Sequence, residues 1–216
     1  MTASALLAAL AAPTPRLDRV ALAIASLDDG PGDAAAVEAQ LDGWGARVAA
    51  ATRGEVHAGI DALERLLVSD LGFTGDRDDY DHPYNSFLPR VLARRRGLPI
   101  LLSVVWLEVA RRAELPLVGL ALPGHFVVGY RSGPGSLVVI DPFERARILT
   151  RGELDAIAAR AGTKLGAEHL APATADAIAA RMLRNLAASY RRRGRADKLA
   201  EVVALEAALT GADVLN

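Results

Sequence analysis

The segment from Ile100 to Ala113 constrains the fold more than any other part of the chain, because it is apolar nearly all the way round a helix. Pro99, directly before it, suits the first helical position, where an N–H would have no partner. A helix without a polar face is stable only when other elements cover it on every side. The sequence therefore predicts a buried central helix, whose apolar side chains include Leu101, Leu102, Val104, Val105, Leu107 and Val109.

The chain before this helix shows helical periodicity. Apolar stripes at helical spacing run over residues 17–27, 37–48 and 56–67, and the short apolar run 3–12 predicts a first helix packed on the core. That run has no basic stretch before it, which argues against a signal peptide. Ser86 is a suitable N-cap for a short helix bearing Phe87, Leu88, Val91 and Leu92, and Gly97 is a suitable end for it.

The pattern changes after Pro116. Segments 117–122, 125–131 and 137–141 are short and rich in Val, Leu and aromatic residues, as strands are, and the loop 132–136 joins the last two as a hairpin. Thr150 and Glu153 form a capping box for a helix that ends near Ala161. Two further helices are predicted at 175–193 and 195–210, hinged at Gly194. Helices, a meandering antiparallel sheet and helices again indicate an α+β fold.

Composition excludes several functions. The chain of 216 residues has a net charge of −1 and no cysteine, which removes disulfides, thiolate metal sites and thiol catalysis. Arginine clusters at 94–96, 111–112 and 191–193 end predicted helices, where they complement the helix dipole, so we expect no nucleic-acid partner. No stretch is long and apolar enough to cross a bilayer. We expect a cytoplasmic protein with no membrane partner and no cofactor.

The predicted hairpin brings one histidine and one aspartate together. If Arg131 pairs with Leu137 across the five-residue loop, Val127 lies opposite Asp141. His125 and Asp141 then share a face as diagonal neighbours, within about 7–8 Å between their Cα atoms. An imidazole oriented by a carboxylate is two-thirds of a nucleophilic triad. The alternative is a structural hydrogen bond at the end of the sheet, and the spacing alone favours this alternative.

Several motifs resemble the SirB-type bacterial proteins of the transglutaminase-like superfamily, which often carry a tetratricopeptide tail. The resemblance covers about 17–209. Its motifs are Asn85-Ser86-Phe87-Leu88, Arg94-Arg95-Arg96-Gly97-Leu98-Pro99-Ile100, Leu107-Glu108-Val109-Ala110-Arg111-Arg112, Leu115-Pro116-Leu117, Pro123-Gly124-His125-Phe126 and Asp141-Pro142-Phe143. It implies a papain-like core over 1–172 and a tetratricopeptide-like tail over 173–216.

The resemblance also implies roles for single residues. In active transglutaminase-like enzymes a cysteine begins the central helix, a histidine activates it and an aspartate orients the histidine. By position, His125 and Asp141 fill the last two roles, and the cysteine position falls at Pro99, which has no nucleophile. We therefore expect a non-catalytic protein with a vestigial pair. It would bind a protein or peptide in a cleft lined also by Asn85, Phe126 and Phe143.

The chain departs from SirB-type proteins at two positions. Glu144 and Arg145 follow the Asp-Pro-Phe motif, where relatives often have a Gly-rich turn. Tyr84 stands where relatives often have arginine.

Other interpretations remain open. Ser103, one helical turn beyond Pro99, is the alternative nucleophile for a hydrolase of the amidase, esterase or peptidase type that would use His125 and Asp141. A tail that recruits partners by itself is a third hypothesis. The acidic loop 76–82 lacks the glycine and glutamate of an EF-hand, so we expect no metal and interpret it as a solvated loop.

Overall fold

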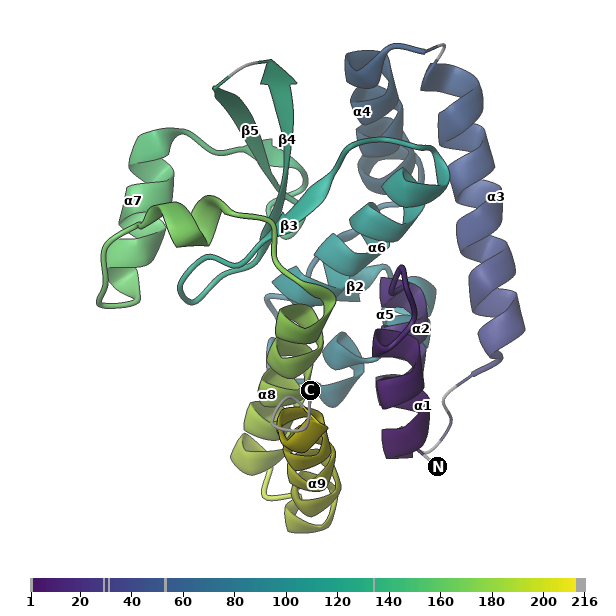
Figure 1. Ribbon diagram of the computed structural model, residues 1–216, viewed down its shortest axis with the longest axis vertical. Coiled ribbons are helices and arrows are strands. Elements are labelled where there is room, and N and C mark those ends of the chain that lie inside the picture. Colours follow the sequence, from purple (N-terminus) through teal and green to yellow (C-terminus); the bar gives the residue numbers. More distant parts are fainter. Residues whose placement is uncertain (1, 29, 31, 53, 134, 213–216) are drawn as a thin grey trace.

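The structure is a computed structural model that describes residues 2–28, 30, 32–52, 54–133 and 135–212. One helix, α6 (Pro99–Arg112), lies at its centre, with every residue from Pro99 to Ala110 buried. The helices that pack on it are α2 (Leu17–Ala25), α3 (Ala34–Thr52), α4 (Val56–Glu64), α5 (Leu88–Arg94) and α8 (Ala175–Arg192), which surround it in Figure 1. The predicted central helix is confirmed, and Pro99 occupies its first turn.

The helical N-terminal part also agrees with the prediction. The first helix, α1 (Thr2–Leu10), packs on α2 and on the C-terminal helix α9 (Ala196–Ala212). Helix α4 continues as a π-helical turn over Arg65–Asp70, which keeps Leu66, Leu67 and Val68 buried. These contacts join the N-terminal and C-terminal helices around α6, so the tail packs against the same core as the rest of the chain.

A four-stranded antiparallel sheet covers another side of α6. Its strands lie in chain order, β3 (Val118–Leu120), β4 (Val127–Gly133), β5 (Ser136–Asp141) and β6 (Arg147–Ile148). Arg131 pairs with Leu137, which confirms the predicted register. The strands continue past the predicted loop boundaries to a Gly133–Ser136 pair beyond a bulge, and Pro134 of that loop lies outside the described residues. The α+β prediction is confirmed.

The two faces of the sheet meet different partners. Val128, Tyr130 and Ile140 belong to the main core beside α6, whereas Val127 and Val139 join a smaller core with Leu154 of α7 (Arg151–Arg160). This alternation follows from the two-residue period of a strand. Asp141 has the parity of Val139, so it lies on the face that α7 covers. The capping box of Thr150 and Glu153 begins α7 as predicted.

The prediction for the chain around α5 is wrong in two details. Ser86 does not cap α5, because it ends a 3-10 turn (Pro83–Ser86), and Phe87 takes the capping position. Gly97 does not end α5, because Arg95 already ends it in the left-handed conformation, with a φ of 58°. Gly97 instead belongs to β2 (Arg96–Gly97), which pairs in parallel with β1 (Thr74–Gly75). No local pattern indicated this small sheet.

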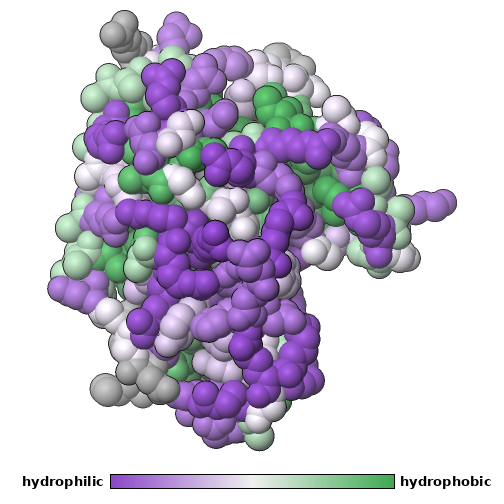
Figure 2. All heavy atoms as spheres, turned by 180° about the vertical axis from the view of Figure 1, so that it is seen from behind, coloured by the Kyte–Doolittle hydropathy of each residue, from purple (hydrophilic) through white to green (hydrophobic). Residues whose placement is uncertain are grey.

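The tail forms the two predicted helices, α8 and α9, joined at Gly194 in the left-handed conformation. A 3-10 turn, η3 (Ala167–Leu170), precedes them, and residues 213–216 of the predicted tail lie outside the described part. In Figure 2 the unit that carries the sheet and α7 projects from the helical body, whose lower part is mostly hydrophilic on this face. None of the helices within the described residues is long and apolar enough to cross a membrane.

Candidate functional site

His125 and Asp141 form a close side-chain pair at the end of the sheet. His125 Nε2 lies 2.7 Å from Asp141 Oδ2. The other carboxylate oxygen, Oδ1, accepts a hydrogen bond of 3.0 Å from the N–H of Phe143. The side chain of Asp141 is 3% exposed and that of His125 is 17% exposed, so only the imidazole reaches the surface. Within the described residues, His125 Nδ1 has no hydrogen-bond partner and remains available to a ligand.

The turn before β4 positions the imidazole. Gly124 adopts a φ of 68°, which a side chain would strain, and the His125 N–H closes the turn on Leu122 O at 3.2 Å. The same carbonyl accepts a second hydrogen bond of 2.9 Å from Arg181 Nη1 of α8. The tail therefore contacts the turn that carries His125, a relation between residues 59 positions apart in the chain.

The turn after β5 holds the carboxylate. Arg145 and Ala146 both have positive φ, 54° and 64°, and the Ala146 N–H donates to Asp141 O at 2.9 Å. Residues other than glycine pay a conformational cost there. SirB-type relatives often have a Gly-rich turn at this place. The positive φ values explain that preference, because glycine adopts them without strain. Strain of this kind persists only where surrounding contacts hold the backbone, and it gathers at functional sites.

The pair faces a cleft of about 690 Å³, between the sheet end, α7 and the loop after β1. Pro99, His125, Asp141 and Phe143 line it together, so the structure brings these four predicted residues to one place. The remaining side chains that line it are charged, aromatic or apolar: Arg77, Tyr80, Pro123, Gly124, Glu144, Arg147, Leu149, Glu153, Ala156, Ile157, Arg160 and Ala161. Within the described part, this lining includes neither serine nor threonine.

Phe143 joins the wall of this cleft to the loop after β1. A Cβ on Gly75 would lie 2.5 Å from the Phe143 ring, so only glycine permits this approach. The ring meets Tyr80 edge to face at 5.9 Å between centroids, and the His125 ring at 6.3 Å. The Arg77 guanidinium lies over it at 5.6 Å. This position of residues 75–80 depends on the unpredicted strands β1 and β2.

A buried carboxylate fixes the rest of that loop, so the interpretation of 76–82 as a wholly solvated segment is wrong for Asp76. Asp76 Oδ2 lies 2.7 Å from Arg94 Nη2, and Oδ1 accepts from the Asp79 N–H at 3.2 Å. Burial alone would raise the pKa of Asp76, but these hydrogen bonds outweigh it and lower the pKa below its ordinary 3.8. Arg94 therefore forms a specific ion pair as well as ending a helix.

Three of the predicted site residues do not line the cleft. Asn85 is fully buried and donates to Asp79 O and Tyr80 O, so it supports the loop from behind. Phe126 is 1% exposed and belongs to the main core. Ser103 is fully buried, with its hydroxyl 3.5 Å from Phe126 O, and a nucleophile there would have no access to substrate. Sequence motifs did not separate lining residues from the residues beneath them.

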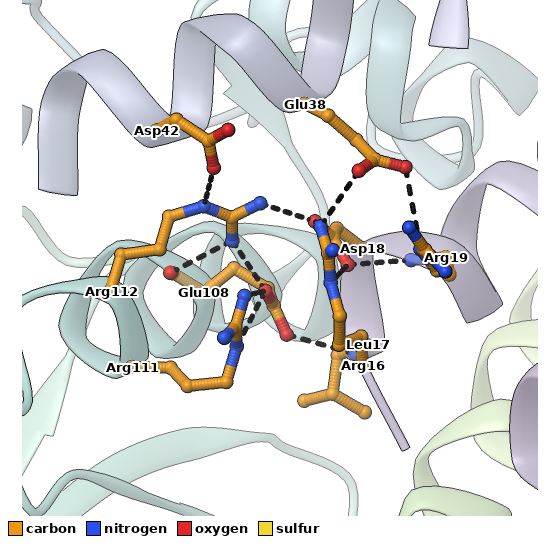
Figure 3. Close-up of polar contacts among 9 residues, drawn as sticks. All are labelled: Arg16, Leu17, Asp18, Arg19, Glu38, Asp42, Glu108, Arg111 and Arg112. Atoms are coloured by element: carbon orange, nitrogen blue, oxygen red, sulfur yellow. Dashed lines mark hydrogen bonds and ion pairs between the residues drawn. The ribbon is translucent and has the colours of Figure 1, made fainter. Parts of the chain in front are cut away.

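A second cluster of charges, buried at its centre and exposed at its edges, lies between α2, α3 and α6 (Figure 3). Arg112 is central: its guanidinium contacts Asp18, Asp42 and Glu108 at 2.5, 2.6 and 2.6 Å. Glu108 also accepts from the N–H of Leu17 at 2.8 Å. The other members are Arg16, Arg19, Glu38 and Arg111. Each side chain has a partner and none lines the cleft, so the cluster joins helices and leaves no acid or base spare for chemistry.

The described residues include no group of three His, Asp or Glu side chains able to hold a metal.

Comparison with known proteins gives one match to a protein family. Residues 35–184 match the family described as the transglutaminase-like superfamily. No solved structure matches the chain.

The chain is similar to two bacterial proteins and to one protein of the mouse. Over 107 residues the chain is 44% identical to a UPF0162 protein of Xylella fastidiosa, a match that covers 50% of this chain and 37% of that protein. It is 33% identical over 84 residues to the protein SirB1 of Salmonella typhimurium, with 39% and 31% covered. It is also 33% identical over 103 residues to F-box only protein 21 of Mus musculus, with 44% and 16% covered. These matches span well under half the length of each relative.

Proposed function

The chain belongs to the transglutaminase-like superfamily, with SirB-type relatives as the motifs predicted, and we propose that it is a non-catalytic member that binds a protein or peptide segment in the cleft beside His125. One observation carries this proposal. The cleft holds an ordered His–Asp pair. However, Pro99 stands at the start of α6, where a nucleophilic cysteine would be needed, and the chain has no cysteine. An oriented imidazole without a nucleophile can still donate or accept a hydrogen bond.

The borders of the cleft favour an extended peptide. Strand β6 is the outermost strand on that side and shares the cleft through Arg147. At the opposite edge, β3 is covered by a bridge between Leu120 and Pro172. A peptide strand can therefore add beside β6, where main-chain hydrogen bonds give affinity and side-chain pockets give specificity. Ile148 of β6 is 64% exposed and offers an apolar contact to such a peptide.

The lining offers both charge and apolar contact to a peptide. Arg77 pairs with Glu144, and Arg147 pairs with Glu153. Leu149 and Ile157 supply apolar surface to the same lining. A polar peptide with one apolar anchor fits such a lining better than a wholly apolar ligand does.

Photo-cross-linking tests the proposal. A benzophenone amino acid is placed at Ala156 in the cleft and, as a matched control, at exposed Val203 of α9. In extracts of the source organism, we expect Ala156 to capture a defined protein that Val203 does not capture, and His125→Ala to reduce this capture. Equal capture from both positions would overturn cleft binding. Turnover of amide, ester or glutaminyl substrates by the wild type, abolished by His125→Ala, would overturn the non-catalytic assignment.

The tail has a separate part in the proposal. We infer that α8 and α9 are a tetratricopeptide-like pair that caps the core, which their packing on α2, α6 and α1 supports. One pair offers no groove by itself, because such repeats bind through stacked copies. If the tail alone recruited the partner, His125→Ala would leave capture unchanged.

A further inference from the structure

A second hollow, of about 420 Å³, lies behind the turn that carries His125. It is formed by the turn at 121–124, Thr163 after α7, His169 of η3, and one face of α8. Pro123 and Gly124 line both this hollow and the cleft, so the turn is the wall between them. The three α8 residues, Arg181, Arg184 and Asn185, are spaced i, i+3 and i+4 and therefore share one helix face.

Arg181 is partly buried, and the described residues give it no carboxylate partner. Its guanidinium donates to Leu122 O at 2.9 Å and lies 5.7 Å from the centre of the Phe126 ring. Burial lowers the pKa of Arg181, and the positive charge of Arg184 lowers it further. A guanidinium has five N–H donors, so most of the donors of Arg181 have no protein acceptor among the described residues.

Other partly buried arginines of this chain have different neighbours. Arg16, Arg90 and Arg112 each pair with a buried aspartate. Arg95 lies over the rings of Trp44 and Phe73, at 4.9 and 5.0 Å from their centres, and its buried Nη1 has no hydrogen-bond partner among the described residues. The neighbours of Arg181 are the Phe126 ring, a second arginine and the phenol group of Tyr80. Two like charges on one face of a hollow are unfavourable until an anion compensates them.

The remaining lining also presents donors. His169 Nδ1 accepts from the Gly166 N–H at 2.9 Å, so in the neutral imidazole the proton resides on Nε2, which is then a donor. Asn185 adds a side-chain amide. The carboxylate of Glu168 lies 3.7 Å from His169 Nδ1, within ion-pair distance but beyond hydrogen-bond distance, and its side chain is 73% exposed.

We propose that this hollow binds the phosphate group of a small molecule, held by Arg181 and Arg184. Phosphate accepts hydrogen bonds on every oxygen, and near neutral pH its charge approaches −2, which matches two guanidinium groups. The hollow is larger than a phosphate group alone, and its volume falls in the range of small-molecule sites. Since Arg181 also binds Leu122 O, the phosphate would lie directly behind the turn of His125.

The test uses the chain of 216 residues and measures melting temperature and calorimetric binding. The probes are inorganic phosphate, glycerol phosphate and succinate, against chloride at equal ionic strength. We expect both phosphates to raise the melting temperature and succinate to give little effect. Arg184→Gln, at an exposed position, should weaken phosphate binding about tenfold or more. Arg191→Gln, exposed on the same helix and outside the hollow, is the control with the same charge change.

Four outcomes overturn the proposal. The wild type could show no phosphate effect beyond that of chloride, or bind succinate as well as phosphate. Arg191→Gln could weaken binding as much as Arg184→Gln, which would indicate a general charge effect. Loss of phosphate binding in His125→Ala with full binding in Arg184→Gln would place the anion in the cleft instead. Arg181→Gln should also weaken binding; if it fails to fold, Arg184→Gln decides the question.

Discussion

The imidazole of His125 is held by Asp141 through Nε2, at 2.7 Å from Oδ2. Because Phe143 N–H fixes the second oxygen of that carboxylate at 3.0 Å, Asp141 has little freedom to rotate. The ring nitrogen left for the cleft is therefore Nδ1. Pro99, at the start of α6, lines the same cleft as the His125 ring.

A thiol introduced at Pro99 tests whether the position still activates a nucleophile. The N-terminus of a helix and a nearby imidazolium both stabilise a thiolate. In Pro99→Cys, the only thiol of the protein, we expect a pKa below the usual value of about 8.5. The measurement is the rate of iodoacetamide alkylation against pH. Val203→Cys, on the exposed side of α9, is the control and should titrate near the usual value.

The contribution of His125 to the pKa of that thiol can be measured separately from the contribution of the helix terminus. In Pro99→Cys with His125→Ala, only the helix terminus remains, so the thiol pKa should rise toward that of the Val203→Cys control. If the thiol of Pro99→Cys has the same pKa as the control even with His125 present, neither the helix terminus nor His125 activates a nucleophile at position 99.

The approach of Gly75 to Phe143 predicts a large effect from one methyl group. Gly75→Ala would place a Cβ 2.5 Å from the ring, so Phe143 must move away from His125 and Tyr80. We expect the free energy of unfolding to fall by about 1–3 kcal/mol, as in overpacked cores. Gly43→Ala is the control, because nothing lies within 4 Å of its added Cβ in α3, and it should stabilise the helix slightly. Denaturant titration of both variants makes the comparison, and equal stabilities would contradict this packing.

The turn after Asp141 predicts a stabilising substitution. Arg145 is exposed and has a φ of 54°, so Arg145→Gly removes backbone strain and should raise the free energy of unfolding by about 1 kcal/mol. Arg145→Ala removes the same side chain but keeps the strain, and it should change stability little. If alanine stabilises the protein as much as glycine does, the side chain and not the backbone causes the effect.

Local patterns predicted much of this fold. The apolar circumference of α6, the Arg131–Leu137 register and the Thr150 capping box depend on residues close in sequence. Strands β1 and β2 have two residues each, too few to show a period, and they pair across about twenty residues of chain. The contact from Arg181 to Leu122 spans 59 positions and has no signal in either segment.

The candidate site was predictable to a smaller extent. Hairpin parity placed His125 near Asp141, because a strand has a fixed period. The motif residues Asn85 and Phe126 were expected in the cleft, and Ser103 was the alternative nucleophile, but all three lie beneath the surface. Periodicity fixes the face on which a residue lies, whereas its depth depends on what the rest of the chain places over that face.

The Asp18–Arg112 pair predicts how stability depends on pH. Burial alone would raise the pKa of Asp18, but hydrogen bonds from Arg16 and Arg112 outweigh it and lower the pKa below 3.8. A carboxyl group whose pKa is lower in the folded state stabilises the fold above its unfolded pKa, and this stabilisation is lost as the pH falls through the folded value. Asp18→Asn should therefore cost about 1.5–3 kcal/mol at pH 7, because Arg112 loses one of its three carboxylate partners and keeps Asp42 and Glu108.

The pH profile and a surface control separate this cause from a general loss of packing. The difference in unfolding free energy between wild type and Asp18→Asn should stay constant from pH 7 to about pH 4 and shrink below it. Asp155→Asn breaks an ion pair with Arg151 that is 52% exposed on the aspartate side, so it should cost less than about 1 kcal/mol. A difference for Asp18→Asn that persists unchanged to pH 2 would mean that shape, and not the carboxylate charge, holds α2 to α6.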